Sequence, residues 1–119
     1  IGEEDADTIV RSLRRRRFVD DSRYAGAFVR DKYRFARWGR RKIELALRQK
    51  RVDADIIAEA LEEIDEDEYT EVLRQLIVLK SRLLGSADTY DARSRLFRFA
   101  VLRGFESTIV SKIISQVLK

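Results

Sequence analysis

Apolar residues recur at intervals of three and four along most of this chain, which is the spacing of amphipathic helices. Between residues 18 and 64 the pattern is interrupted twice by short polar turns, so this stretch predicts three helices. The first follows Asp20 and Asp21, which are good N-cap residues, and runs to about residue 36. The second covers about 40–49, and the third begins after Asp53.

The first of these helices offers its aromatic residues mainly to one side. Tyr24, Ala25, Phe28 and Phe35 can share one broad face, whereas Tyr33 fits that face less well. Their spacing is that of packing, so we predict that the face belongs to the core.

The apolar pattern of the second and third helices returns 53 positions later, without gaps. A repeat near fifty residues is a supersecondary unit that cannot bury its apolar face alone and must stack on its neighbours. The chain is therefore predicted to be all-α, built from tandem three-helix repeats, with the handedness of stacking not predicted. The paired positions are Ile43 and Leu96, Ala46 and Phe99, Leu47 and Ala100, Val52 and Phe105, Ile56 and Ile109, Ile57 and Val110, Ala60 and Ile113, Leu61 and Ile114, and Ile64 and Val117.

The second copy of the pattern predicts three further helices. A long helix opens it and can end at Gly85, and a loop of about ten residues, 85–94, is expected to be the most mobile part. A short helix can then end at Gly104. Ser107 or Thr108 is the expected N-cap of the last helix.

These patterns divide the chain into three parts. Residues 1–17 are the remnant of a first repeat, ending in its last helix, residues 18–66 form a second repeat and residues 67–119 a third. The chain begins with Ile1 and contains no methionine, so we expect it to be a piece of a longer protein, with most of the first repeat missing.

Charge is distributed in blocks. Residues 1–51 carry 16 basic and 8 acidic residues, residues 52–71 carry 10 acidic residues and no basic one, and residues 72–119 carry 9 basic and 3 acidic residues. This layout suggests two cationic surfaces separated by an anionic seam. Each block could equally be only the solvated side of a helix. The acidic block lacks the ligand alternation and central glycine of a calcium loop, so we interpret it as a helix end followed by a cap.

The composition excludes several classes of function. Without cysteine or histidine there is no disulfide framework, no Ser-His-Asp or Cys-His apparatus and no common zinc site. The five glycines are scattered, so no phosphate-binding loop is present. No run of about 18 apolar residues occurs, and we find no apolar segment behind a basic start of the kind typical of a signal peptide. We therefore expect a cytoplasmic, monomeric protein that is not an enzyme and uses no cofactor, metal or small-molecule substrate.

Basic residues gather at two places in numbers that exceed what helix capping requires. Four consecutive arginines occupy positions 14–17, and a second group surrounds Trp38 in the turn before the second helix. An aromatic residue among cations could stack on a nucleic-acid base or fill a hot spot at a protein interface. It could equally cover the end of the core. From charge and position, the candidate contact residues are Arg14, Arg15, Arg16, Arg17, Arg34, Arg37, Trp38, Arg40, Arg41 and Lys42.

One stretch resembles a known family. The stretch reads Phe18-Val19-Asp20-Asp21-Ser22-Arg23-Tyr24-Ala25. It resembles the motif that opens the second of three tandem three-helix repeats in the RecX family of bacterial recombinase regulators. A basic turn containing glycine follows, as in that family, here Arg37-Trp38-Gly39-Arg40-Arg41. The later Lys-Gly-hydrophobic step is matched by Arg103-Gly104-Phe105. In Lys50-Arg51-Val52 arginine replaces the glycine, which argues against a left-handed helix end at Arg51.

The resemblance covers nearly the whole chain from Thr8 onward. It implies a regulatory protein that binds the filament of the RecA recombinase, lies along its groove and suppresses filament growth, ATP hydrolysis and strand exchange. Such a protein would modulate DNA repair, recombination and the SOS response without a cofactor, and its cationic faces could also meet single- or double-stranded DNA. The alternative is a nucleic-acid-binding module, since three-helix units with basic turns resemble helix-turn-helix domains and the pI is about 9.6. A third hypothesis is a helical scaffold for another partner.

Overall fold

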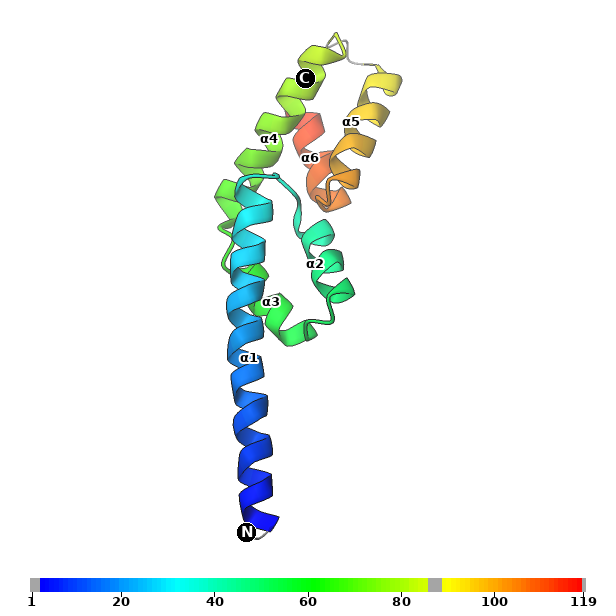
Figure 1. Cartoon of the computed structure of the whole chain (residues 1–119). Coiled ribbons are helices and arrows are strands. Elements are labelled where there is room, and N and C mark those ends of the chain that lie inside the picture. Colours follow the sequence, from blue (N-terminus) through cyan, green and yellow to red (C-terminus); the bar gives the residue numbers. More distant parts are fainter. Residues whose placement is uncertain (1–2, 86–88, 119) are drawn as a thin grey trace.

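The computed structural model describes residues 3–85 and 89–118, and six helices lie within these ranges (Figure 1). Within these ranges there is no strand, and the all-α prediction is confirmed. The helices are α1 (Glu3–Arg34), α2 (Arg40–Gln49), α3 (Ala54–Glu62), α4 (Glu66–Leu83), α5 (Tyr90–Leu102) and α6 (Ser107–Val117).

The helices form two triplets that follow one another along the chain. In the first triplet α1, α2 and α3 all contact one another, and in the second α4, α5 and α6 do the same. Figure 1 shows the second triplet continuing from the end of the first, so that the two stack lengthwise. The predicted tandem three-helix architecture is therefore confirmed.

The repeat of the sequence is also a repeat of burial. Corresponding side chains fill corresponding places in the two triplets, because the apolar register keeps the same residues on the inner faces. Pairs with both members buried are Ile43 and Leu96, Leu47 and Ala100, Val52 and Phe105, Ile57 and Val110, and Ala60 and Ile113.

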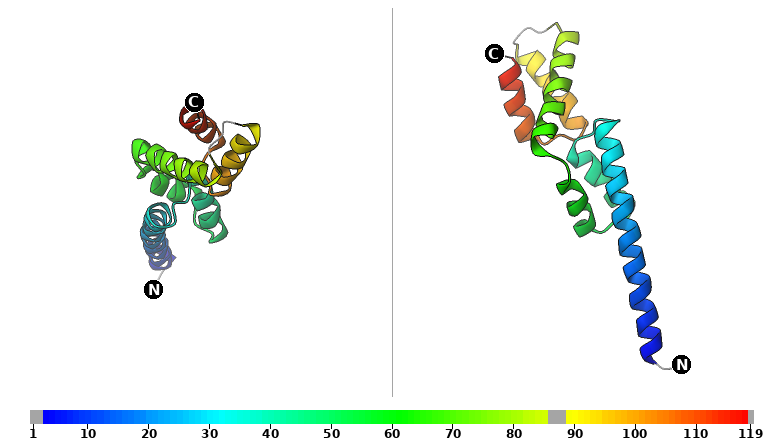
Figure 2. Two further views of the ribbon diagram at one scale, coloured as in Figure 1. Left: turned by 90° about the horizontal axis from the view of Figure 1, so that it is seen from above. Right: turned by 90° about the vertical axis from the view of Figure 1, so that its left-hand side faces the viewer.

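Helix α1 is continuous from Glu3 to Arg34, so the predicted break before a new helix at Asp20 and Asp21 is wrong. No glycine or proline occurs between residues 3 and 25, and the arginines there are good helix formers. Asp21 lies inside the helix and approaches Arg17 one turn earlier, with 3.9 Å between Oδ2 and Nε. The N-terminal half of α1 projects beyond the triplet, and the molecule measures 74 × 20 × 19 Å (Figure 2).

The inner face of α1 differs from the predicted one. Ala25, Val29 and Tyr33, spaced four apart, are buried against the triplet. Phe28 is half-buried, but the ring of Phe35 is 83% exposed, beyond the end of the helix. The core of the first triplet therefore uses Tyr33, which the sequence pattern placed poorly, and leaves Phe35 outside.

The chain reverses through left-handed residues at the helix ends. Gly85 and Gly104 have φ values of 85° and 101°, as expected where a glycine ends a helix. Arg51 has a φ of 63°, so the expectation against a left-handed helix end there is wrong. Arg37, after α1, also has a positive φ of 54°.

The helix starts follow the predicted caps only in part. Asp53 is the N-cap residue of α3, but its side chain makes no capping bond. Glu106, not Ser107 or Thr108, occupies the N-cap position of α6, and its side chain likewise makes no capping bond. In the acidic block Asp65 accepts a hydrogen bond of 2.9 Å from the Glu68 amide, which confirms its interpretation as a cap.

The predicted loop 85–94 is shorter than expected. Thr89 caps α5 by accepting a 3.0 Å hydrogen bond from the Ala92 amide, and the helix begins at Tyr90. Residues 86–88, part of the segment predicted to be mobile, lie outside the described residues.

Candidate protein-interaction surface

The basic turn between α1 and α2 is fixed by backbone hydrogen bonds to the second triplet. The Gly39 amide donates to the Arg103 carbonyl at 2.7 Å, and the Arg41 amide donates to the Gly104 carbonyl at 2.9 Å. The guanidinium of Arg103 returns to the turn and donates to the carbonyls of Ala36 and Arg37 at 2.6 and 3.3 Å. The turn that carries the predicted contact residues is therefore a rigid part of the junction between triplets.

Two glycines let the backbone of the basic turn and the backbone after α5 approach each other closely at this junction. A Cβ at Gly39 would lie 2.3 Å from backbone atoms of Gly104 and Phe105. A Cβ at Gly104 would lie 2.4 Å from the Cβ of Lys42 and 2.6 Å from its amide nitrogen. Both positions exclude any side chain, because the neighbouring atoms are mostly backbone.

The guanidinium of Arg40 forms ion pairs within the molecule and is mostly shielded from solvent. It bridges carboxylates of the second triplet, Glu106 at 2.8 Å and Glu66, and lies 4.1 Å from the ring centre of Tyr69. Tyr69 in turn donates to Glu106 and accepts a 3.0 Å hydrogen bond from the Arg40 amide. Arg40, which the sequence offered as a candidate contact residue, therefore uses its charge to join the two triplets.

The electrostatics of this cluster follow from burial and pairing. Burial alone would lower the pKa of Arg40, but the hydrogen bond to Glu66 and the charge of Glu106 raise it above its ordinary value. Burial and the hydrogen bond to Glu106 raise the pKa of Tyr69 well above the usual tyrosine range. The bridge therefore keeps its charged arginine and neutral tyrosine throughout the physiological pH range.

An aromatic column crosses the junction beside Arg40. The ring of Tyr33 stacks on that of Tyr69 at 6.1 Å between centroids, and Tyr69 contacts Phe105 at 5.1 Å. The Tyr33 hydroxyl is buried without a hydrogen-bond partner. Burial, with the nearby charges of Glu68 and Asp65, raises its pKa to about 12.

Trp38 takes one of the two roles that the sequence left open, the packing role, and cations lie beside its ring. Its half-buried ring contacts Phe28 edge-on at 6.4 Å and so covers the end of the first core. The ammonium groups of Lys32 and Lys42 lie 4.8 and 4.4 Å from its ring centre. Lys50 adds a third cation, 5.9 Å from the ring centre of Phe28. We name Phe28, Trp38, Lys32, Lys42 and Lys50 the cation–aromatic cluster.

The sequence indicated only half of this cluster. It singled out Trp38 and Lys42, but missed Lys32, Lys50 and the role of Arg103. Lys32 precedes Trp38 by six residues and approaches it because the Trp38 amide donates back to the Lys32 carbonyl at 3.0 Å. A basic residue in the last turn of the predicted helix, six positions before the aromatic residue of the following turn, was the available signal.

The four arginines at 14–17 lie on the projecting half of α1, exposed to solvent. Successive helical residues differ by about 100° in direction, so these side chains point around the helix and do not form one face. The same half-helix exposes five large apolar residues: Ile9, Val10, Leu13, Phe18 and Val19.

The structure does not bring the two basic groups together. Arg17 lies 17 residues before the end of α1 at Arg34, which corresponds to roughly 25 Å along the helix. Arg34 and Arg41 are exposed and Arg37 is half-buried, all near the junction. The candidates thus divide into a projecting arginine helix and a basic junction.

Other kinds of site find no support in the described part of the chain. No group of three or more acidic residues there is arranged to hold a metal ion. None of its helices is both long and apolar enough to cross a bilayer.

The comparisons with known proteins agree on one family. Residues 20–61 match the family model described as RecX, second three-helix domain. A protein named Regulatory protein RecX from Clostridium botulinum strain Eklund 17B is 31% identical over 96% of this chain and 55% of its own length. Its counterparts from C. botulinum strain Alaska E43 and Amycolatopsis mediterranei are 35% and 26% identical, over 89% and 98% of the chain and 50% and 67% of their lengths. No solved structure matches significantly. The chain spans about half the length of the first of these relatives.

Proposed function

Because the chain belongs to the RecX family of regulatory proteins, we propose that it binds the filament of the RecA recombinase and lowers its activity. The observation that carries the proposal is shape combined with charge. The molecule is a rod 74 Å long, with exposed cations on the projecting helix and at the junction. A rod with two separated cationic regions can contact more than one subunit of a helical polymer.

Each basic region supports a different part of this contact. The junction is rigid, so Arg41 and the cation–aromatic cluster present a preformed surface to a partner. The projecting helix offers arginines and apolar residues on the same segment. The family relationship concerns proteins about twice as long, so we further propose that part of this apolar surface is covered by another helical unit, the first repeat predicted from the sequence.

The test is a comparison of charge reversals with equal change in charge. The double variant Arg37→Glu and Arg41→Glu alters the junction, and the control Arg82→Glu and Lys112→Glu alters exposed positions of the second triplet. ATP hydrolysis by RecA on single-stranded DNA is measured against the concentration of each protein. We expect the junction variant to need at least about tenfold more protein for half-inhibition, and the control to behave as the unmodified chain. Equal inhibition by both variants, with folding verified by circular dichroism, contradicts the assignment of the junction.

The cation–aromatic cluster favours a second candidate function, binding of nucleic acid, because rings flanked by cations suit bases and phosphates. The two functions are separated by titrating labelled single-stranded DNA without RecA at increasing salt. Tight binding with a steep salt dependence supports the nucleic-acid module, whereas weak binding together with RecA inhibition supports the regulator.

A further inference from the structure

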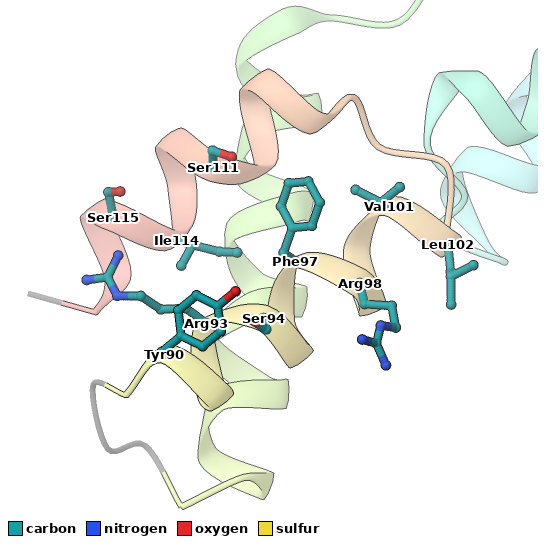
Figure 3. A pocket seen from close by; sticks show the side chains of 10 residues that line it. All are labelled: Tyr90, Arg93, Ser94, Phe97, Arg98, Val101, Leu102, Ser111, Ile114 and Ser115. Carbon is teal, nitrogen blue, oxygen red and sulfur yellow. The ribbon is translucent and has the colours of Figure 1, made fainter.

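A groove on the second triplet lies outside the surfaces assigned so far. It has a volume of about 640 Å³ and runs between α5 and α6. In Figure 3 the ring of Phe97 stands between the two helices, with Tyr90 near the start of α5 and Leu102 near its end. A second hollow, lined by α2 and the end of α5, adjoins it at Val101 and Leu102, which line both. The two hollows together extend from α6 across α5 to α2.

The floor of this groove is apolar and open to solvent. Tyr90, Leu102 and Leu45 are 88%, 70% and 58% exposed, and Val101 is 37% exposed. Along α5, positions 90, 94, 97 and 101 lie on one side of the helix, while Leu96 and Ala100 are buried in the core. Helix α5 therefore carries a second apolar stripe, of which Phe97 packs partly against the core while Tyr90 and Val101 remain exposed. Exposed apolar surface of this kind, concentrated in one groove, marks a binding surface.

The charges around the groove are positive. Arg98 lines one hollow and Arg41 the other, and neither forms an ion pair within the part of the chain that the structure describes. Glu44 is the one carboxylate among the described lining residues, and it pairs with Arg48 at 2.8 Å. The groove thus joins an apolar floor to cations available for a partner.

We propose that this groove binds an acidic amphipathic helix of a partner protein. The apolar side chains of such a helix would enter the floor, and its carboxylates would meet Arg98 and Arg41. From Tyr90 to Leu102 the floor extends for roughly 18 Å, which corresponds to about three turns of a bound helix. This inference goes beyond the proposed function, with which it shares only Arg41.

Other occupants fit less well. The exposed apolar residues of α1 are accompanied by arginines, so a second copy would bring like charges to Arg98. The acidic block 52–71 of a second copy has no large apolar side chain exposed among its residues. Nucleic acid would meet the aliphatic side chains of Leu45, Val101 and Leu102 along much of the floor, and bases do not stack on these as they do on an exposed ring such as that of Tyr90. A different protein with an acidic amphipathic segment satisfies both features of the groove.

The experiment uses the whole chain and a designed probe. The probe is a fluorescein-labelled helical peptide of about four turns with leucines spaced three and four apart and glutamates between them. Its affinity is measured by fluorescence anisotropy. We expect Arg98→Glu and Leu102→Asp each to weaken binding at least about tenfold. The same changes at exposed residues of α4, Arg82→Glu and Leu83→Asp, serve as matched controls and should leave binding unchanged.

Altered probe peptides and the oligomeric state of the chain in solution complete the test. Replacing the glutamates by glutamine, or the leucines by serine, should each weaken binding, because the groove combines charge with apolar contact. The proposal is overturned if the parent peptide does not bind, if either altered peptide binds equally well, or if the controls lose as much as the groove variants. It is also overturned if sedimentation detects a dimer that Leu102→Asp dissociates, because the groove would then bind a second copy of the chain. Displacement of the peptide by single-stranded DNA would likewise overturn it, because the groove would then bind nucleic acid. Since RecA is absent, none of these outcomes decides the proposed function.

Discussion

The two triplets end their middle helices with the same backbone turn, but they use different residues for it. After α2 the left-handed position is Arg51, with a φ of 63°, and after α5 it is Gly104, with a φ of 101°. The turns lie 53 positions apart, and in each the amide three residues after the helix donates back into it, Val52 to Leu47 and Phe105 to Ala100, both at 3.2 Å. The shape of the turn is therefore repeated even where its glycine is not.

The surroundings explain the difference. Arg51 is exposed, so its side chain costs only the conformational strain of a left-handed residue. Gly104 is buried in the junction, where a Cβ would meet Lys42 at 2.4 Å. The comparison teaches that the turn itself tolerates a side chain, whereas the contact between triplets does not.

The largest effect should follow Gly104→Ala. The added Cβ combines a clash with the Lys42 backbone and an unfavourable φ, so we expect a loss of about 3 kcal/mol or more of the free energy of unfolding. Urea denaturation followed by circular dichroism measures it. Gly85→Ala is the matched control, because its φ is 85° but no atom lies within 4 Å of its Cβ. If both variants lose the same free energy, the glycine at 104 serves the turn alone.

A second prediction concerns Arg40 and its repeat counterpart Arg93. Arg40→Ala removes the bridge between Glu66 and Glu106 and leaves a half-buried carboxylate unpaired, so we expect a loss of about 2 kcal/mol. Arg93 donates to the Leu118 carbonyl at 3.2 Å within its own triplet, and Arg93→Ala should cost less. Denaturation of both variants provides the comparison. An equal or larger loss at Arg93 would contradict the special role of the bridge.

Much of this architecture was predictable from the sequence, because apolar periodicity and the 53-residue repeat depend on local spacing. The helices around Ile43 and Val110 and their burial followed directly. The break before Asp20 was predicted wrongly, since aspartates are good caps only where a helix must begin, and nothing between residues 3 and 25 interrupts α1.

The candidate site was predicted less well. The bridging role of Arg40 depends on Glu66 and Glu106, which are distant in sequence, and charge alone cannot distinguish an arginine paired across a junction from one left in solvent. The same holds for the groove, because the sequence pattern singled out neither Leu45 nor Leu102, and their exposure follows only from the packing of α2 and α5.

The stacked tyrosines, one from each triplet, predict a dependence on pH. Tyr33 has its pKa raised from 10.0 to about 12, so the folded state holds a proton that the unfolded state loses first. Its contribution to stability is complete below pH 10 and is lost as the pH rises towards 12, about 1 kcal/mol of it by pH 11. Urea denaturation at pH 9 and 11 should show a smaller loss in Tyr33→Phe than in the unmodified chain. Tyr24→Phe, at a largely exposed position, is the control and should retain the full loss.

The smallest effect is expected at the exposed turn. Arg51→Gly relieves the left-handed strain but increases the freedom of the unfolded chain, so we expect a net gain of about 0.5 kcal/mol. A rise of a few degrees in the melting temperature, measured by calorimetry, would agree with this. A lower melting temperature would mean that the arginine side chain contributes a contact that outweighs its strain.

Because α1 runs without a break from the projecting arginines into the first triplet, the angular position of those arginines is set by residue count alone. One alanine inserted between Arg17 and Phe18 would turn everything before it by about 100° and move it about 1.5 Å along the axis. Seven inserted residues would nearly restore the original direction at a greater reach. The projecting segment therefore has a phase relative to the body, and any partner that contacts both should be sensitive to single-residue insertions far more than to the identity of the residue inserted.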